Sequence, residues 1–130
     1  MSRYSAENCP QHLLGKVRSD DIKQSIKGMP CDLRIASFVP GLQCAPRDTV
    51  VGAHAGSLGK GTRTKVSDHF ICAACHTCHA ILDGQHHGWE YIAEHYPAAV
   101  LERVLAGVAA TQLRLIMLGK IIVPKSEFIQ

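Results

Sequence analysis

Aromatic residues, net charge and long apolar runs are all scarce in this sequence. Its 130 residues include only three Phe, three Tyr and one Trp, and the formal net charge is +3. So small a charge excludes a uniformly basic surface, and any basic region must be local. No apolar run approaches the roughly 20 residues that a membrane span requires, and none follows a basic N-terminal start. We therefore expect one cytoplasmic domain with no membrane partner, whose cysteines stay reduced and serve as metal ligands.

Cysteine and histidine, by contrast, are concentrated in one stretch. Residues 72–83 read CAACHTCHAILD and contain three cysteines and two histidines. Thiolate and imidazole are the side chains that bind zinc and other transition metals most readily, so this density indicates a metal site rather than packing. Two C-x-x-C pairs overlap here, Cys72 with Cys75 and Cys75 with Cys78.

The residues that follow favour the second pair. In a zinc knuckle the second cysteine commonly opens a helix, whose residues three and four positions apart share one face. If Cys78 is that cysteine, His79 and Asp83 stand at i and i+4 and could share a cation. We therefore favour Cys75 and Cys78 as the ligand pair, and leave Cys72 as a buried thiol or a spare ligand.

A second pair of cysteines lies upstream, at Cys31 and Cys44. A structural zinc ion takes about four protein ligands. Two cysteine pairs, the later one turning into a helix, are typical of a zinc-ribbon or treble-clef site. Cys31, Cys44, Cys75 and Cys78 are thus the predicted zinc ligands, which leaves His79 and Asp83 for a second, catalytic cation.

The rest of the chain predicts an α+β fold. Capping, glycine, proline and periodicity signals indicate a helix over 19–27, a strand and turn over 33–44, a β-prone run over 49–54, helices over 89–118 and a short strand over 121–124. Pro97 suits the first turn of a fresh helix. The expected core stripe of that last helix consists of Leu101, Val104, Leu105, Val108, Gln112 and Leu115.

A glycine-rich loop at 56–65 carries three cations, Lys60, Arg63 and Lys65. Such a loop can bring backbone amides and cations close to phosphate, although it lacks the Walker spacing. The alternative is an ordinary solvated loop. His54 lies just before it and between the two cysteine pairs, a position that makes a functional role about as probable as a structural one.

With these residues in place, the chain resembles the HNH, or ββα-metal, nucleases, and in particular the small prophage-encoded YbcO-like nucleases. The resemblance covers about residues 27–123. It is carried by Cys31-Asp-Leu-Arg-Ile, Cys44, Ala53-His54, Gly61-Thr-Arg-Thr-Lys65, Asp68, Cys75-x-x-Cys78-His79-x-x-x-Asp83, Ala110-Thr-Gln112 and Gly119. It implies a small zinc-stabilised treble-clef or ββα-metal unit packed against C-terminal helices.

The resemblance also implies roles for individual residues. His54 takes the position of the general base that activates water for attack on a DNA phosphodiester. Asp68 stands where these nucleases commonly carry asparagine, while His79 and Asp83 stand where the helix supplies ligands for Mg²⁺ or another divalent cation. Lys60, Arg63 and Lys65 would contact DNA phosphates. A recombination or replication protein is a further partner that this reading allows.

On this reading the chain divides into an N-terminal segment, 1–27, of unknown role, a nuclease domain, 28–124, and a tail, 125–130. The main alternative is a non-catalytic zinc module that binds DNA or a recombination protein. A c-type cytochrome is disfavoured although C-x-x-C-H occurs twice, because export is not indicated and Cys31 and Cys44 would have no use. A thioredoxin-like site is disfavoured because no βαβ pattern precedes it.

Overall fold

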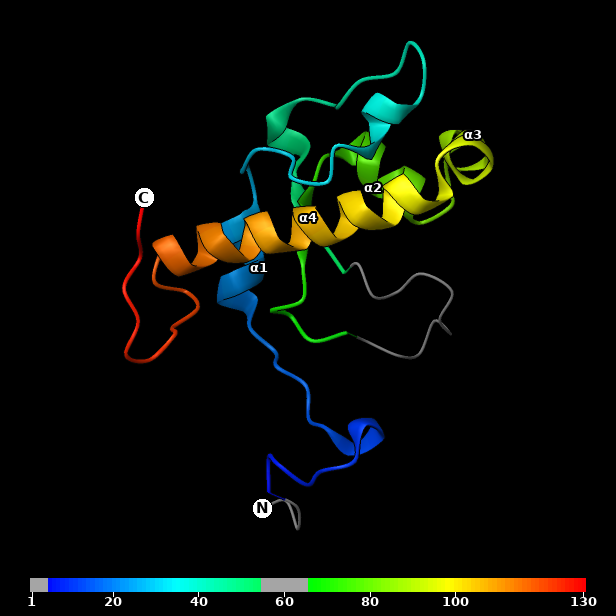
Figure 1. Cartoon of the computed structure of the whole chain (residues 1–130). Coiled ribbons are helices and arrows are strands. Elements are labelled where there is room, and N and C mark those ends of the chain that lie inside the picture. Colours follow the sequence, from blue (N-terminus) through cyan, green and yellow to red (C-terminus); the bar gives the residue numbers. More distant parts are fainter. Residues whose placement is uncertain (1–4, 55–65) are drawn as a thin grey trace.

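A computed structural model describes residues 5–54 and 66–130 of the chain (Figure 1). The described elements are the 3-10 helices η1 (Gln11–Leu13), η2 (Ile35–Phe38) and η3 (Arg47–Thr49), the strands β1 (Val51–Ala53) and β2 (Cys72–Ala74), and the helices α1 (Asp20–Ile26), α2 (His76–Leu82), α3 (Gly88–His95) and α4 (Pro97–Met117). The predicted α+β class is confirmed. The cations of the glycine-rich loop, Lys60, Arg63 and Lys65, lie outside the described residues.

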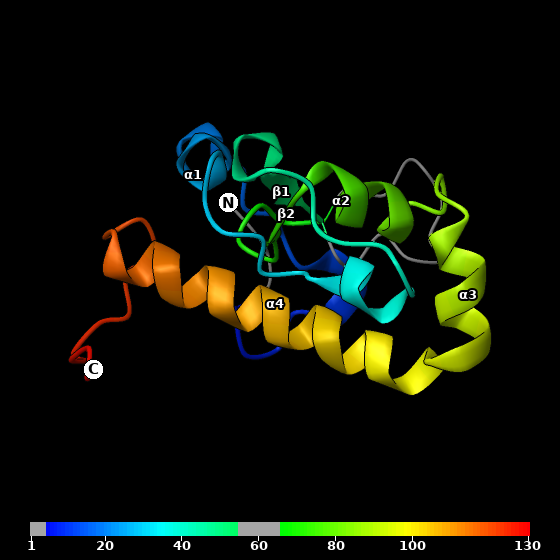
Figure 2. The same ribbon diagram turned by 90° about the horizontal axis from the view of Figure 1, so that it is seen from above.

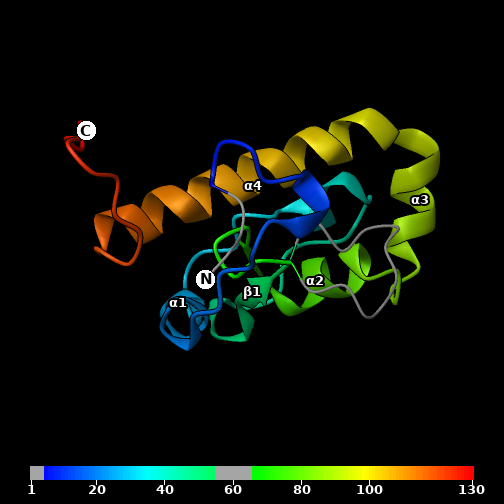
Figure 3. The same ribbon diagram turned by 90° about the horizontal axis from the view of Figure 1, so that it is seen from below.

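The two strands form a small antiparallel sheet at the centre of the molecule. Val51 pairs with Ala74, Gly52 with Ala73 and Ala53 with Cys72. The predicted β-prone run is therefore confirmed. Every residue of β2 is buried, because α4 packs on it and further chain segments surround it. The α1 helix, the sheet and α2 all lie on the same side of α4 (Figures 2 and 3).

The α1 helix forms where its local signals predict. The Ser19 side chain accepts a hydrogen bond from the Ile22 amide as an N-cap, and Gly28 adopts the positive φ of a helix stop. Ile22 and Ile26 are buried in the common hydrophobic core. The segment that precedes the expected boundary at residue 28 thus contributes to the same core as the rest of the chain.

The α4 helix begins at Pro97 and is followed by Gly119 in the left-handed region, as predicted. The expected core stripe is partly wrong. Leu101 and Leu105 are exposed, and the buried positions are Val100, Val104, Gly107, Val108, Thr111 and Leu115. The stripe is rotated because the helix approaches β2 closely at Gly107, where an added Cβ would stand 2.7 Å from Cys72 Sγ and 2.9 Å from Asp32 O.

A buried carboxylate anchors α4 to the sheet. Arg114 donates from Nε to Asp32 Oδ2 and from a terminal nitrogen to Oδ1, both at 3.0 Å. The Thr111 hydroxyl donates to Asp32 Oδ2 at 2.9 Å and accepts from the Ala73 amide at 2.9 Å. The Asp32 amide in turn donates to Ala73 O at 2.9 Å. This network fixes the segment after Cys31 against both β2 and α4.

Two predicted strands are not formed. Residues 35–38 make the 3-10 helix η2, because Arg34 takes a left-handed φ of 52° and the Arg34 and Ala36 amides turn toward cysteine sulfurs. The predicted turn at Gly41 is present, with a φ of 77°. Residues 121–124 are irregular and lead into a turn, and Ile122 is exposed there, since no neighbouring strand is available to it within the described chain.

Candidate metal centre and neighbouring polar pairs

Four cysteines from three parts of the chain meet at the start of α2. The Sγ atoms of Cys31, Cys44, Cys75 and Cys78 all lie within 4.8 Å of one another, and Cys44 Sγ is 3.7 Å from Cys78 Sγ. Tetrahedral zinc with Zn–S bonds near 2.3 Å places its sulfurs about 3.8 Å apart. The group therefore has the donor set and the spacing of a Cys₄ metal site, the grouping that the sequence predicts.

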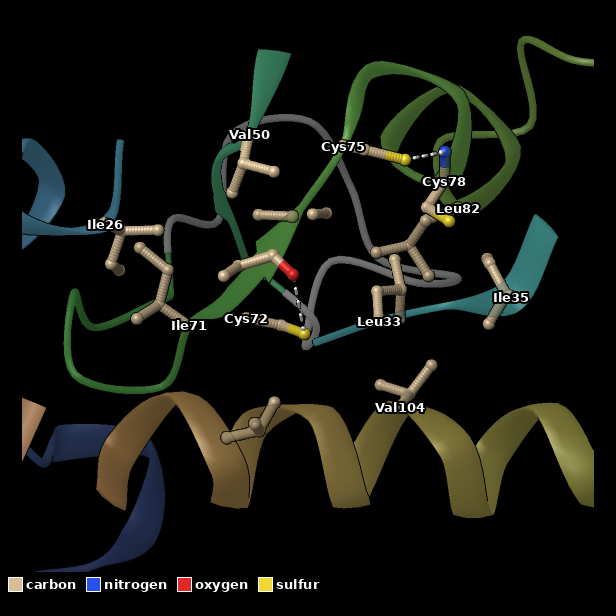
Figure 4. Packing of buried hydrophobic residues seen from close by; sticks show 14 of the residues in the cluster. Ile26, Leu33, Ile35, Val50, Ile71, Cys72, Cys75, Cys78, Leu82 and Val104 are labelled. Carbon is tan, nitrogen blue, oxygen red and sulfur yellow. Dashed lines mark hydrogen bonds between the residues drawn. The ribbon is translucent and has the colours of Figure 1, made fainter. Parts of the chain in front are cut away.

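Backbone amides surround these sulfurs. Each donates a hydrogen bond to sulfur over 3.3–3.5 Å: the Arg34 and Cys75 amides to Cys31, the Ala45 and Cys78 amides to Cys75, and the Ala36 amide to Cys78. Amide donors stabilise thiolate and orient metal ligands. Figure 4 shows the bond from the Cys78 amide to Cys75 Sγ at the first turn of α2.

The thiols influence each other's protonation. Hydrogen bonds from the Cys78 thiol and from the Arg34 and Cys75 amides outweigh burial and lower the pKa of Cys31 to about 4. Burial and the nearby charge of Cys31 raise the pKa of Cys44 to about 11. The hydrogen bond to Cys31, together with burial, also raises the pKa of Cys78. The Cys31 thiolate thus favours the protonated forms of Cys44 and Cys78, and a divalent cation would take the place of those protons.

The position of Cys72 distinguishes between the two overlapping pairs. Cys72 is buried in β2 and faces α4 at Gly107, outside the four-cysteine group (Figure 4). Burial and the nearby Asp32 carboxylate raise its pKa to about 12, which favours a neutral thiol. The structure therefore brings Cys75 and not Cys72 into the group. Of the two roles that the sequence left open for Cys72, a buried thiol or a spare ligand, the structure shows the buried thiol.

The α2 helix carries His79 and Asp83 as expected, although it begins earlier than predicted. It starts at His76, because Cys75 Sγ serves as the N-cap and accepts from the Cys78 amide. His79 Nε2 lies 3.3 Å from Asp83 Oδ2 at the i, i+4 spacing, and the two side chains are 34 % and 40 % exposed.

Asp68 and His54 form a second polar pair. Asp68 is only 2 % exposed, and its Oδ1 lies 3.1 Å from His54 Nε2. Oδ2 accepts from the Ser19 amide at 2.6 Å, and an Arg18 nitrogen lies 3.8 Å from Oδ1. Burial by itself raises the pKa of Asp68, but the bonds from the Ser19 amide and His54 prevail and lower it.

The predicted site residues therefore fall into separate groups. Among residues 5–54 and 66–130, the four cysteines are the only set of three or more potential ligands close enough to share an ion. Asp68 contacts His54 and does not form such a set with His79 and Asp83. One polar pair lies at the end of β1, and the other lies on α2.

Sequence reasoning missed the residues that support this arrangement. Asp32, Thr111 and Arg114 position the first cysteine segment, and Arg18 and Ser19 position Asp68. Asp32 and Thr111 lie within stretches that carry the family resemblance, but the resemblance gives them no role. No motif marks Arg18 or Arg114, because each acts through a partner that is distant in the sequence. The only local signal is Ser19, which is recognisable as a helix N-cap.

Three comparisons with known proteins found no match for this chain. No protein-family model, curated protein or solved structure matches the sequence or its fold. No helix within the described residues has the length and apolar character needed to cross a membrane. Fold and site together define an α+β protein with a group of four cysteines that could hold a metal ion such as zinc.

Proposed function

We propose that the protein is a metal-dependent endonuclease of the HNH kind, which hydrolyses DNA phosphodiester bonds and is stabilised by zinc at its four cysteines. The observation that carries the proposal is the placement of one polar pair at the end of β1 and of another on α2. His54, paired with the buried Asp68, follows β1, and the His79–Asp83 pair lies on α2 directly after the cysteine group. The ββα-metal resemblance implies this order of parts.

His54 would act as the general base. Asp68 Oδ1 lies 3.1 Å from His54 Nε2, and a carboxylate at this distance orients the imidazole and increases its strength as a base. Asp68 is held by the Ser19 amide and is buried, so it restrains the imidazole in one orientation. A positioned base typically contributes about 10²–10⁴-fold to rate.

His79 and Asp83 would hold the catalytic cation, expected to be Mg²⁺ or another divalent ion. One imidazole and one carboxylate leave coordination positions open to water and phosphate. When bound, such a cation polarises the scissile phosphate and stabilises the leaving oxygen. Lys60, Arg63 and Lys65, which follow His54 in the sequence, would bind the DNA backbone, and binding would weaken as salt rises.

A nicking assay on supercoiled and single-stranded DNA, with Mg²⁺ or Mn²⁺, tests the proposal. We expect cleavage by the wild type, a loss of about 10²–10⁴-fold in His54→Ala, and a loss in His79→Ala that is partly restored by excess metal. His95→Ala is the matched control, because His95 is an exposed histidine on α3. The assay is run with and without a recombination protein.

The outcomes separate the readings. Cleavage that persists equally in His54→Ala and His79→Ala would identify a contaminating nuclease. No cleavage by the wild type under either condition would leave the non-catalytic zinc module as the better description. One observation favours that second candidate: His79 and Asp83 have no third ligand beside them among the described residues. If the wild type does not cleave, a salt-dependent DNA affinity that both substitutions leave unchanged would support it.

A further inference from the structure

The four cysteines of the candidate metal centre differ in their exposure to solvent. Cys75 and Cys78 are fully buried, Cys31 is half-buried, and Cys44 is the exposed member of the group. Figure 4 shows Cys75 and Cys78 among the core side chains. A reagent in solution therefore reaches Cys44 more readily than the other three sulfurs, and such access is one of the two main determinants of cysteine reactivity.

Hydrogen bonding sets the same residue apart. Cys31 Sγ and Cys75 Sγ each accept from two backbone amides, and Cys78 Sγ accepts from one, over 3.3–3.5 Å. Within the described chain no backbone amide donates to Cys44 Sγ. An amide donor stabilises the negative charge of a thiolate and so weakens the sulfur as a nucleophile. Cys44 lacks this stabilisation.

A partner for an oxidised Cys44 lies close by. Cys44 Sγ is 3.7 Å from Cys78 Sγ, and a disulfide bond is about 2.05 Å long, so the two sulfurs would have to approach by roughly 1.7 Å. Cys44 stands in irregular chain, at 42–46, between η2 and η3, whereas Cys78 is fixed in α2. The Cys44 segment can therefore make this movement without breaking a helix or a strand.

We propose that Cys44 is the site at which a hydroperoxide oxidises the metal-bound protein, and that the disulfide it then forms with Cys78 releases the ion. The inference rests on zinc being bound at the four cysteines, as in the proposed function. Metal binding removes the protons of all four thiols, so the bound sulfurs differ in exposure and hydrogen bonding rather than in charge. Both differences select Cys44.

The oxidation takes two steps. First, the Cys44 thiolate attacks one oxygen of hydrogen peroxide; the S–O bond forms as the O–O bond breaks, which gives a sulfenic acid and hydroxide. Second, the Cys78 thiolate attacks the Cys44 sulfur; the S–S bond forms as the S–O bond breaks, and a second hydroxide leaves. Both hydroxides take protons from solvent, so one peroxide is reduced to two waters while two thiolates are oxidised to one disulfide. Cys31 and Cys75 remain, which is too few ligands for a structural zinc site.

Treatment of the zinc-loaded full chain with hydrogen peroxide tests the site of oxidation. Within the four-cysteine group we expect the first sulfenic acid, trapped with dimedone, at Cys44, followed by a Cys44–Cys78 disulfide and by transfer of zinc to a colorimetric indicator. Trypsin cleaves after Arg34, so Cys31 and Cys44 fall in separate peptides for mass spectrometry. A first adduct at Cys31 or Cys75, or a disulfide that omits Cys44, would overturn the proposal.

Two histidine substitutions form a matched pair. Cys44→His and Cys31→His each leave three thiolates and one imidazole, which is a common donor set for structural zinc. Peroxide should release zinc about tenfold more slowly from Cys44→His than from the wild type, and at nearly the wild-type rate from Cys31→His. Equal slowing in the two variants would contradict the selection of Cys44. The peptide mapping of the wild type decides the question even if either variant fails to fold.

Zinc content separates the failure of this inference from the failure of the zinc site. Wild-type protein that holds one equivalent of zinc and keeps it in excess peroxide would overturn the inference alone. Wild-type protein without zinc would overturn the zinc site and the inference together. DNA cleavage is not among the measurements, so each outcome is independent of the nuclease activity.

Discussion

At the scale of single residues, Asp68 connects the parts of the candidate catalytic site. Its carboxylate joins His54, at the end of β1, to the Ser19 amide, which lies 49 residues earlier in the sequence. The Asp68 amide also donates to Val17 O at 2.8 Å, and Arg18 donates to Val66 O at 2.8 Å. The N-terminal segment therefore helps to hold a residue that the resemblance places in the site.

The lowered pKa of Asp68 makes stability depend on pH. A carboxyl group whose folded pKa lies below its unfolded value near 4 stabilises the fold above that pH, and the contribution is lost as pH falls through the folded pKa. Asp68→Asn removes this titration. Denaturant unfolding from pH 7 to pH 3 should show a stability gap between wild type and Asp68→Asn that narrows as pH falls. A gap that is constant with pH would contradict the assignment.

At the scale of elements, the Asp32 network decides how α4 docks on β2. The Thr111 hydroxyl satisfies both the Ala73 amide and the Asp32 carboxylate, and all three groups are buried. An apolar residue of the same shape at position 111 would remove the hydroxyl that bonds to the Ala73 amide and to the Asp32 carboxylate. The network also explains why Gly107, where α4 comes nearest to Cys72, faces the sheet.

Thr111→Val should accordingly destabilise the fold by about 1–3 kcal/mol, the cost of leaving buried polar groups without a hydrogen bond. Thr111→Ser, which keeps the hydroxyl, is the matched control and should lose less. Denaturant unfolding monitored by circular dichroism gives both values. Equal losses in the two variants would mean that the methyl group, and not the hydroxyl, holds the helix.

At the scale of the whole molecule, the cysteine group joins segments that are otherwise held by little regular structure. Cys31 and Cys44 lie in irregular chain on either side of η2, and the only described sheet has two short strands. A metal bound at four thiolates would connect these segments to α2. We therefore expect folding to depend on zinc.

Zinc analysis of protein purified without chelator should give one equivalent in the wild type and in Cys72→Ser, and a loss in Cys75→Ser. Chelation should lower the melting temperature of the wild type strongly, because metal binding and folding are coupled. Cys72→Ser should be less stable, because it buries a hydroxyl, but its zinc content distinguishes it from Cys75→Ser. Zinc in Cys75→Ser and none in Cys72→Ser would reverse the assignment of the two thiols.

Local chemistry allowed the sequence by itself to determine several elements and to favour Cys75 and Cys78 over the pair that contains Cys72. Ser19, Pro97 and Gly119 begin or end helices through interactions within a few residues, and the cysteine spacing is itself a local pattern. The same reasoning failed where the partner is remote. The run after Leu33 has strand-like residues, yet the Cys78 sulfur of α2 accepts a hydrogen bond from the Ala36 amide, and the run forms η2 instead.

Only the tertiary structure decided which side of α4 is buried and which thiol joins the group. Arg114 meets Asp32 across 82 residues, and Asp68 meets Ser19 across 49, contacts that no periodicity encodes. The apolar residues of α4 are distributed around the helix, so hydrophobicity alone could not distinguish Val100 from Leu101. The close approach at Gly107 favours that choice, because a Cβ there would stand 2.7 Å from Cys72 Sγ and 2.9 Å from the Asp32 carbonyl oxygen.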